Sequence, residues 1–194
     1  MAEHALTAAL FLLPCAIILE RCVADGSLFA LHPALNAVAM LVCLPTVWLT
    51  KLHLFLNVLA GVLVAVAGAA IFITKRDSGG EHFTTPHSWA ALVTGMFFTL
   101  NDFQGLLLTF EGTNPNWQWK DDTHVLTGVL VYIGAVVTML YGLQTSSWGV
   151  QNFTPERQFQ LTVLIIAAHV ALVGKSLVLH RRANKVQVKV AKVA

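Results

Sequence analysis

The chain has 194 residues, of which 56% are hydrophobic and only 11% are charged, and its formal net charge is +2. This composition is typical of an integral membrane protein and leaves no room for a separate soluble domain. The small net charge gives no reason to expect a nucleic-acid partner. We therefore expect an all-α, polytopic membrane protein with a single domain, residues 1–194.

Six apolar segments are candidates for membrane-spanning helices, because a helix needs about 20 apolar residues to cross about 30 Å of hydrocarbon. The segments cover residues 5–24, 28–49, 52–74, 87–109, 124–143 and 159–180. Backbone groups in lipid must be satisfied within each segment, so we expect a bundle of six helices. The second segment is separated from the third by little more than Thr50 and Lys51, so we expect it to be short and strained around Pro45.

Basic residues are distributed unevenly around these segments. Five lie in the C-terminal tail after the last segment, and Lys51, Lys120 and Lys175 bring one side to eight of the twelve. With six spans both termini share that side, which the positive-inside rule assigns to the cytosol or matrix. The tail itself is expected to contact lipid headgroups.

One histidine stands near the start of each of four consecutive segments. These residues are His32, His53, His87 and His124. Because the bilayer tolerates few ionisable groups, this repetition indicates a set of metal ligands. Histidine is the usual axial ligand of haem iron, and helical bundles hold haem in their cores. Alternating helix direction places His32 and His87 near the outer surface, and His53 and His124 near the inner surface. The sequence therefore predicts two haems, each bound by two histidines, which favours electron transfer over oxygen chemistry.

Small or polar residues follow the histidines at four-residue spacing, on the same helical face. They are Asn36, Asn57, Ala91 and Gly128, and the small-residue stripe continues through Gly61, Ala65, Gly68 and Gly95. Such residues leave room for a porphyrin, although small residues also allow helices to pack closely. We interpret the stripe as part of the haem-binding core.

Four short motifs carry a resemblance to a known family. They are Ser27–Pro33 (SLFALHP), Lys51-Leu52-His53, Pro86-His87-Ser88-Trp89, and His124 with Gly128. In this order they resemble the cytochrome b561 family of six-helix transmembrane ascorbate-dependent reductases, over roughly residues 27–145. The resemblance implies a four-helix core with two haem b groups, a cytosolic donor such as ascorbate, and an acceptor such as monodehydroascorbate or a ferric chelate. Family members usually have a longer, basic connection between the second and third helices that contributes to ascorbate binding. Here only Lys51 remains of it.

Six further residues are candidates for contacts with haem propionates or the donor. They are Lys51, Lys120, Lys75, Arg76, Asn57 and Trp89. The lysines and the arginine could attract anionic groups, but each could equally be a positive-inside anchor or a solvated loop residue, and Trp89 could belong to the interfacial aromatic belt. His82 is an alternative to His87, without the Ser-Trp context.

Two ionisable residues inside the last apolar segment, His169 and Lys175, have either a functional role or hydrogen bonds to a neighbouring helix. Asn101, Asp102 and Gln104 form a polar cluster that could line a proton or donor path, or whose members could satisfy one another. The leading hypothesis is an oxidoreductase that transfers electrons across the membrane from ascorbate, alone, as a homodimer or within a larger complex. The alternative is an accessory, haem-binding subunit of a larger membrane complex, such as a respiratory one, without its own ascorbate site. A haem-free transporter or scaffold is a third reading.

Overall fold

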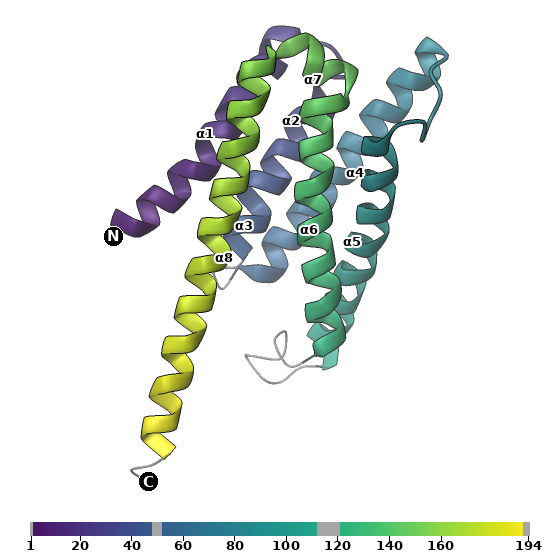
Figure 1. Ribbon diagram of the computed structural model, residues 1–194. Coiled ribbons are helices and arrows are strands. Elements are labelled where there is room, and N and C mark those ends of the chain that lie inside the picture. The colour runs from purple at the N-terminus through teal and green to yellow at the C-terminus, as the bar shows by residue number, and fades with distance from the viewer. Residues whose placement is uncertain (1, 48–51, 112–120, 192–194) are drawn as a thin grey trace.

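The structure, a computed structural model, describes residues 2–47, 52–111 and 121–191, and every regular element in these ranges is a helix (Figure 1). The elements in chain order are α1 (Ala2–Asp25), α2 (Leu31–Val38), the π-helical turn η1 (Ala39–Cys43), α3 (Leu44–Val47), α4 (His53–Ser78), α5 (Pro86–Glu111), α6 (Asp122–Thr145), α7 (Ser147–Asn152) and α8 (Pro155–Ala191). The all-α prediction is confirmed.

In the part of the chain that the structure describes, five helices are long and apolar enough to cross a membrane: α1, α4, α5, α6 and α8. They correspond to five of the six predicted segments. When the shorter α2–α3 segment is counted, consecutive segments run in opposite directions, and the start of α1 and the end of α8 point toward the same end of the bundle (Figure 1). The chain is therefore an integral, multi-pass membrane protein.

The second predicted segment, residues 28–49, differs from the others. Its apolar helix, Leu31–Cys43, is shorter than a full membrane span. It contains η1, where the N–H of Leu44 donates to the carbonyl of Ala39, five residues earlier. Pro45 follows directly and has no N–H to donate to the carbonyl four residues earlier. The strain expected around Pro45 thus takes the form of a π turn, which widens the helix where the regular ladder is interrupted.

Two connections are more helical than the sequence predicted. Helix α4 continues past residue 74 to Ser78, so Lys75 and Arg76 lie in its last turn. It ends because Gly79 adopts a left-handed conformation with φ of 68°, which places Gly80 N–H 2.8 Å from the carbonyl of Lys75. The connection between the predicted segments 124–143 and 159–180 contains α7, and α8 continues through most of the basic tail to Ala191, well beyond the bundle (Figure 1).

Helices α1 and α8 pack together as a pair against one side of the bundle. Each buries a stripe at helical spacing, formed by Phe11, Cys15, Ile18 and Cys22 on α1, and by Leu161, Ile165, Ala168 and Leu172 on α8. A second apolar cluster joins η1, α4, α5 and α6. The second cluster belongs to a four-helix core, α2–α3 with α4, α5 and α6, on which all four candidate histidines lie.

Candidate functional site

The four candidate histidines form two pairs in the four-helix core. His32 on α2 lies beside His87 on α5, with ring centroids 6.0 Å apart. His53 on α4 lies beside His124 on α6, with ring centroids 6.1 Å apart. The structure thus brings together the same residues that alternating helix direction pairs.

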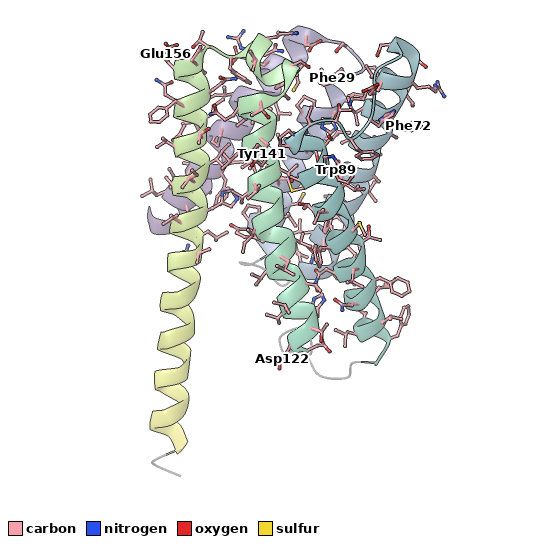
Figure 2. All side chains as sticks on the ribbon, turned by 45° about the vertical axis from the view of Figure 1, so that its right-hand side comes forward. Phe29, Phe72, Trp89, Asp122, Tyr141 and Glu156 are labelled. Atoms are coloured by element: carbon pink, nitrogen blue, oxygen red, sulfur yellow. The ribbon has the colours of Figure 1, made fainter. Side chains whose placement is uncertain are left out.

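The two pairs lie at opposite ends of the core. Figure 2 shows Phe29 and Trp89, which are close in sequence to His32 and His87, toward one end, and Asp122, two residues before His124, at the other. We call them the upper pair (His32 and His87) and the lower pair (His53 and His124), after their places in this view. If each pair bound a cofactor, the two cofactors would lie at different depths in the membrane.

Helix starts fix two of these histidines. Pro86 and His87 open α5, where the hydroxyl of Ser88 accepts from the N–H of Thr85 at 3.0 Å and the hydroxyl of Thr85 accepts from the N–H of Ser88 at 3.2 Å. At the start of α6, the N-cap Asp121 accepts from the N–H of His124 at 2.7 Å. The local sequence therefore sets the depth of each histidine.

Main-chain carbonyls orient the upper pair. His32 Nδ1 lies 3.1 Å from the carbonyl oxygen of Ala67 on α4, and His87 Nδ1 lies 3.0 Å from that of Thr138 on α6. A carbonyl can only accept, so each Nδ1 carries the proton and each Nε2 keeps its lone pair. Metal-binding histidines are typically held in this way. Both residues therefore have an Nε2 lone pair with which they can bind a metal.

A polar network surrounds His124, which is buried. Asn101 Nδ2 on α5 lies 2.7 Å from the His124 carbonyl oxygen and 3.2 Å from His124 Nδ1. It also donates to the Thr127 hydroxyl at 2.8 Å, and this hydroxyl donates to Gln104 Oε1 at 2.7 Å. The network ties α5 to α6 at the level of the lower pair.

The partner of His124 in the lower pair contacts an asparagine one helical turn later on its own helix. Asn57 Nδ2 lies 3.1 Å from His53 Nε2, which connects the predicted candidate Asn57 directly to the lower pair. A metal bound at this nitrogen would replace the hydrogen bond.

Two glycines make room for the imidazole rings. A Cβ on Gly142 of α6 would lie 3.1 Å from His87 Cε1, and a Cβ on Gly105 of α5 would lie 3.1 Å from His124 Cε1. Each of these histidines therefore packs on a glycine of the helix opposite. The sequence analysis did not single out these glycines. An isolated glycine inside a helical pattern often has a packing reason, and this pattern could have indicated both positions.

The predicted small-residue stripe is only partly open. Nothing lies within 4 Å of where a Cβ would be on Gly68 or Gly95, so both border open space. Gly61 differs, because a Cβ there would lie 2.8 Å from Asp102 Oδ2 of α5. The stripe leaves room at two positions and accommodates a carboxylate at the third.

Of the other candidates, Lys75 lies close enough to His32 and His87 for its charge to act on both, and the rest have contacts of their own, are exposed, or fall outside the described residues. Lys75 Nζ donates to the carbonyl of Glu81 at 2.6 Å, Arg76 pairs with Asp77 at 2.9 Å, and Trp89 is 56% exposed. Both Lys51 and Lys120 fall outside the described residues.

Two further histidines are accounted for by other contacts. The rival ligand His82 stacks on Phe72, with centroids 5.0 Å apart, while His87 faces His32. His169 is buried, with Nδ1 2.7 Å from the carbonyl of Ile165 on its own helix. Its ring packs against Phe11 and Tyr132, so it joins α8 to α1 and α6.

The two pairs fit haem iron. Imidazoles on opposite sides of one iron, with metal–nitrogen bonds of about 2 Å, have ring centroids roughly 6 Å apart. Both pairs have about this separation. Among the described residues, no group of three or more His, Cys, Asp or Glu side chains could hold a metal ion. Two histidines suffice when a porphyrin supplies the other ligands of the iron.

A transmembrane four-helix core with two such histidine pairs has the features of a membrane haem protein. The sequence model of the family described as eukaryotic cytochrome b561 matches residues 34–149, more than half of the chain, and the chain belongs to this family. The resemblance seen in the motifs is thereby confirmed. Membership implies transmembrane, haem-dependent electron transfer with haem b as the cofactor. The match includes three of the candidate histidines, and His32 lies two residues before it. A comparison with curated proteins finds no match.

Proposed function

We propose that the chain transfers electrons across the membrane through two b haems, one bound by each histidine pair. The observation that carries this proposal is the presence of two pairs, at opposite ends of the core, with nearly equal ring separations of 6.0 and 6.1 Å. Two cofactors at these positions would divide the membrane thickness into shorter steps for the electron.

The chain's own residues bind and orient the haems. His32 and His87 would hold one iron, while the carbonyls of Ala67 and Thr138 keep the protons on Nδ1. His53 and His124 would hold the other, and Asn101 fixes the His124 backbone and ring. Haem supplies one-electron chemistry when bound. Two histidines per iron leave no open position for oxygen, which suits electron transfer.

We further propose that the donor is ascorbate or a similar small anion, which acts at the lower pair from the cytosol or matrix. The family resemblance and the excess of basic residues on the side of both termini support this orientation. Lys51 and Lys120 stand two and four residues before His53 and His124 in sequence, and on that ground we assign them to the donor site. The acceptor, monodehydroascorbate or a ferric chelate, would act at the upper pair.

Stepwise reduction of the purified protein tests the donor. We expect ascorbate to produce reduced b-type absorption bands and dithionite to add little. Bands that appear only with dithionite would favour the alternative, an accessory subunit that receives electrons from a partner protein. If neither reductant produces haem bands, the electron-transfer proposal is wrong.

Charge neutralisation tests the donor site. Each exposed cation contributes about 1 kcal/mol or less and is screened by salt. The double variant Lys51→Gln, Lys120→Gln should therefore slow ascorbate reduction by roughly tenfold or less at low salt, and by less at high salt. Arg157→Gln, an exposed cation at the start of α8, is the matched control and should leave the rate unchanged. An equal rate for the double variant at every ionic strength would place the donor site elsewhere.

A further inference from the structure

One carboxylate lies inside the four-helix core, at Asp102 on α5. Its side chain points at α4, where Oδ2 lies 2.8 Å from the position that a Cβ on Gly61 would take. Any larger residue at 61 would have to displace this carboxylate. Because Gly61 has no side chain, α4 leaves room for the Asp102 carboxylate of α5.

The carboxylate lies close to the lower pair. Gly105, which packs on the His124 ring, follows Asp102 by three residues on the same face, about 4.5 Å along the helix axis. On α4, Gly61 follows His53 by eight residues, about 12 Å along the axis. Asp102 is thus on the membrane-centre side of the lower pair, where α5 faces α4, the helix that carries His53.

The helices packed against α5 carry few charges near this point. The ionisable residues that the structure describes on α4 are His53, Lys75, Arg76 and Asp77, and those on α6 are Asp122, His124, Tyr132 and Tyr141. Lys75 is fourteen residues from Gly61, about 21 Å along α4. Within the described ranges, no cation forms an ion pair with Asp102. A lone carboxylate in a low-dielectric core responds strongly to any change of charge nearby.

We propose that Asp102 binds a proton when the lower haem is reduced and releases it when that haem is oxidised. The inference rests on the proposed function. As iron(III) gains one electron and becomes iron(II), the site loses one positive charge, and the Asp102 carboxylate takes up one proton to become a carboxylic acid. The electron comes from the donor; ascorbate releases one electron and one proton as it becomes monodehydroascorbate. Asp102 thereby keeps the charge of the core constant.

Asp102 lies nine residues from Glu111 and sixteen from Pro86, so it is nearer the end of α5 at which the donor is proposed to act. The proton therefore needs to cross only part of the membrane.

The pH dependence of the lower haem's midpoint potential tests the proposal. In a His32→Ala background, where only the lower haem should remain, we expect the potential to fall as pH rises through the range in which Asp102 titrates. The limit is a tenfold change in the reduction equilibrium constant per pH unit, about 59 mV for one electron. Asp102→Asn is neutral at every pH. Its potential should match the wild-type value at low pH and exceed it increasingly at high pH.

A matched control separates this effect from surface charge. Asp77→Asn removes an exposed carboxylate at the far end of α4 and should keep the wild-type slope. Asp102→Glu retains a titrating group and should keep a slope. A merely structural role for Asp102 would shift the potential by the same amount at all pH values.

Infrared difference spectroscopy gives a second readout. Reduction should produce a carbonyl band of a protonated carboxyl group in the wild type. The band should be absent from Asp102→Asn and shifted in Asp102→Glu, so the glutamate variant suffices if the asparagine variant does not assemble. An unchanged slope and band in Asp102→Asn would overturn the inference and leave the proposed electron transfer intact. A wild type without haem would overturn both.

Discussion

At the scale of single residues, the upper pair is oriented by backbone atoms of other helices. The carbonyls of Ala67 and Thr138 accept hydrogen bonds from the Nδ1–H groups of His32 and His87, respectively. A side-chain substitution at position 67 or 138 cannot remove these acceptors. The orientation of the upper pair thus depends on how the helices pack, which makes the histidines themselves the direct targets for mutation.

Removal of single histidines should show which residues share a haem. His32→Ala and His87→Ala should delete the same spectral component, because the two rings face each other, and His53→Ala and His124→Ala should delete the other. Reduced-minus-oxidised spectra measure this. His82→Ala, whose ring stacks on Phe72, should retain both haems. Loss of one common component in His32→Ala and His53→Ala would contradict the pairing.

The two ring-contact glycines should act on different haems. A methyl group at 142 or 105 would approach His87 or His124 to 3.1 Å, so the ring must move by a few tenths of an ångström. Crowding of this kind typically costs about 1–3 kcal/mol. Gly142→Ala should alter the spectrum and potential of the upper haem, and Gly105→Ala those of the lower one.

The matched control for the glycine variants is Gly174→Ala on α8, which has nothing within 4 Å of the added Cβ and should leave both haems unchanged. Thermal unfolding would show the stability cost. A change confined to the wrong haem in either variant would contradict the assignment of the rings.

At the scale of elements, the short helix α7 connects α6 to α8 and is held against the end of α1. Trp148 is buried, and its Nε1–H donates to Asp25 Oδ2 at 2.8 Å. Its ring also contacts Phe153 edge-on, with centroids 5.7 Å apart. The hydrogen bond joins segments that are more than a hundred residues apart, and so helps to attach the α1–α8 pair to the core.

Replacement of this tryptophan should loosen α1 without changing the haems. Trp148→Phe keeps an aromatic ring but loses the N–H donor, and the net contribution of one hydrogen bond is about 1 kcal/mol. We expect the unfolding free energy to fall by about this amount while the haem spectra stay unchanged. Trp89→Phe, at an exposed site, is the control and should leave stability unaltered. An equal effect of both substitutions would assign no special role to the Asp25 contact.

At the scale of the whole molecule, the four-helix core can be separated from the helices that cover it. The four histidines belong to α2, α4, α5 and α6, while α1 and α8 pair through their own buried stripes. Haem binding should therefore depend on the core, and the α1–α8 pair should contribute to stability.

The number of haems per chain tests this arrangement. Two pairs with similar geometry should bind two haem b groups per chain, and a pyridine haemochrome assay on detergent-purified protein, compared with the protein concentration, measures the ratio. His53→Ala should reduce the ratio from two to one. A wild-type ratio of one, or none, would show that one of the pairs has another role.

The sequence by itself determined the class of the molecule and its four central residues. The thickness of a bilayer fixes the length of a spanning helix, so apolar length predicted six spans, five of which are long helices in the structure. The tight connection at Thr50 and Lys51 indicated that the second would be short and strained near Pro45. Ionisable groups are rare in lipid, so His32, His53, His87 and His124 stood out from their surroundings. Alternating helix direction then gave their depth and pairing.

The tertiary structure decided which faces meet. A helix that is apolar on every side carries little sequence signal for its rotation about its own axis, because lipid and core accept the same residues. For this reason the carbonyl partners Ala67 and Thr138, the ring contacts of Gly105 and Gly142, and the position of Asp102 over Gly61 could not be read from the pattern. Each depends on how helices distant in sequence pack against one another, which only the folded bundle specifies.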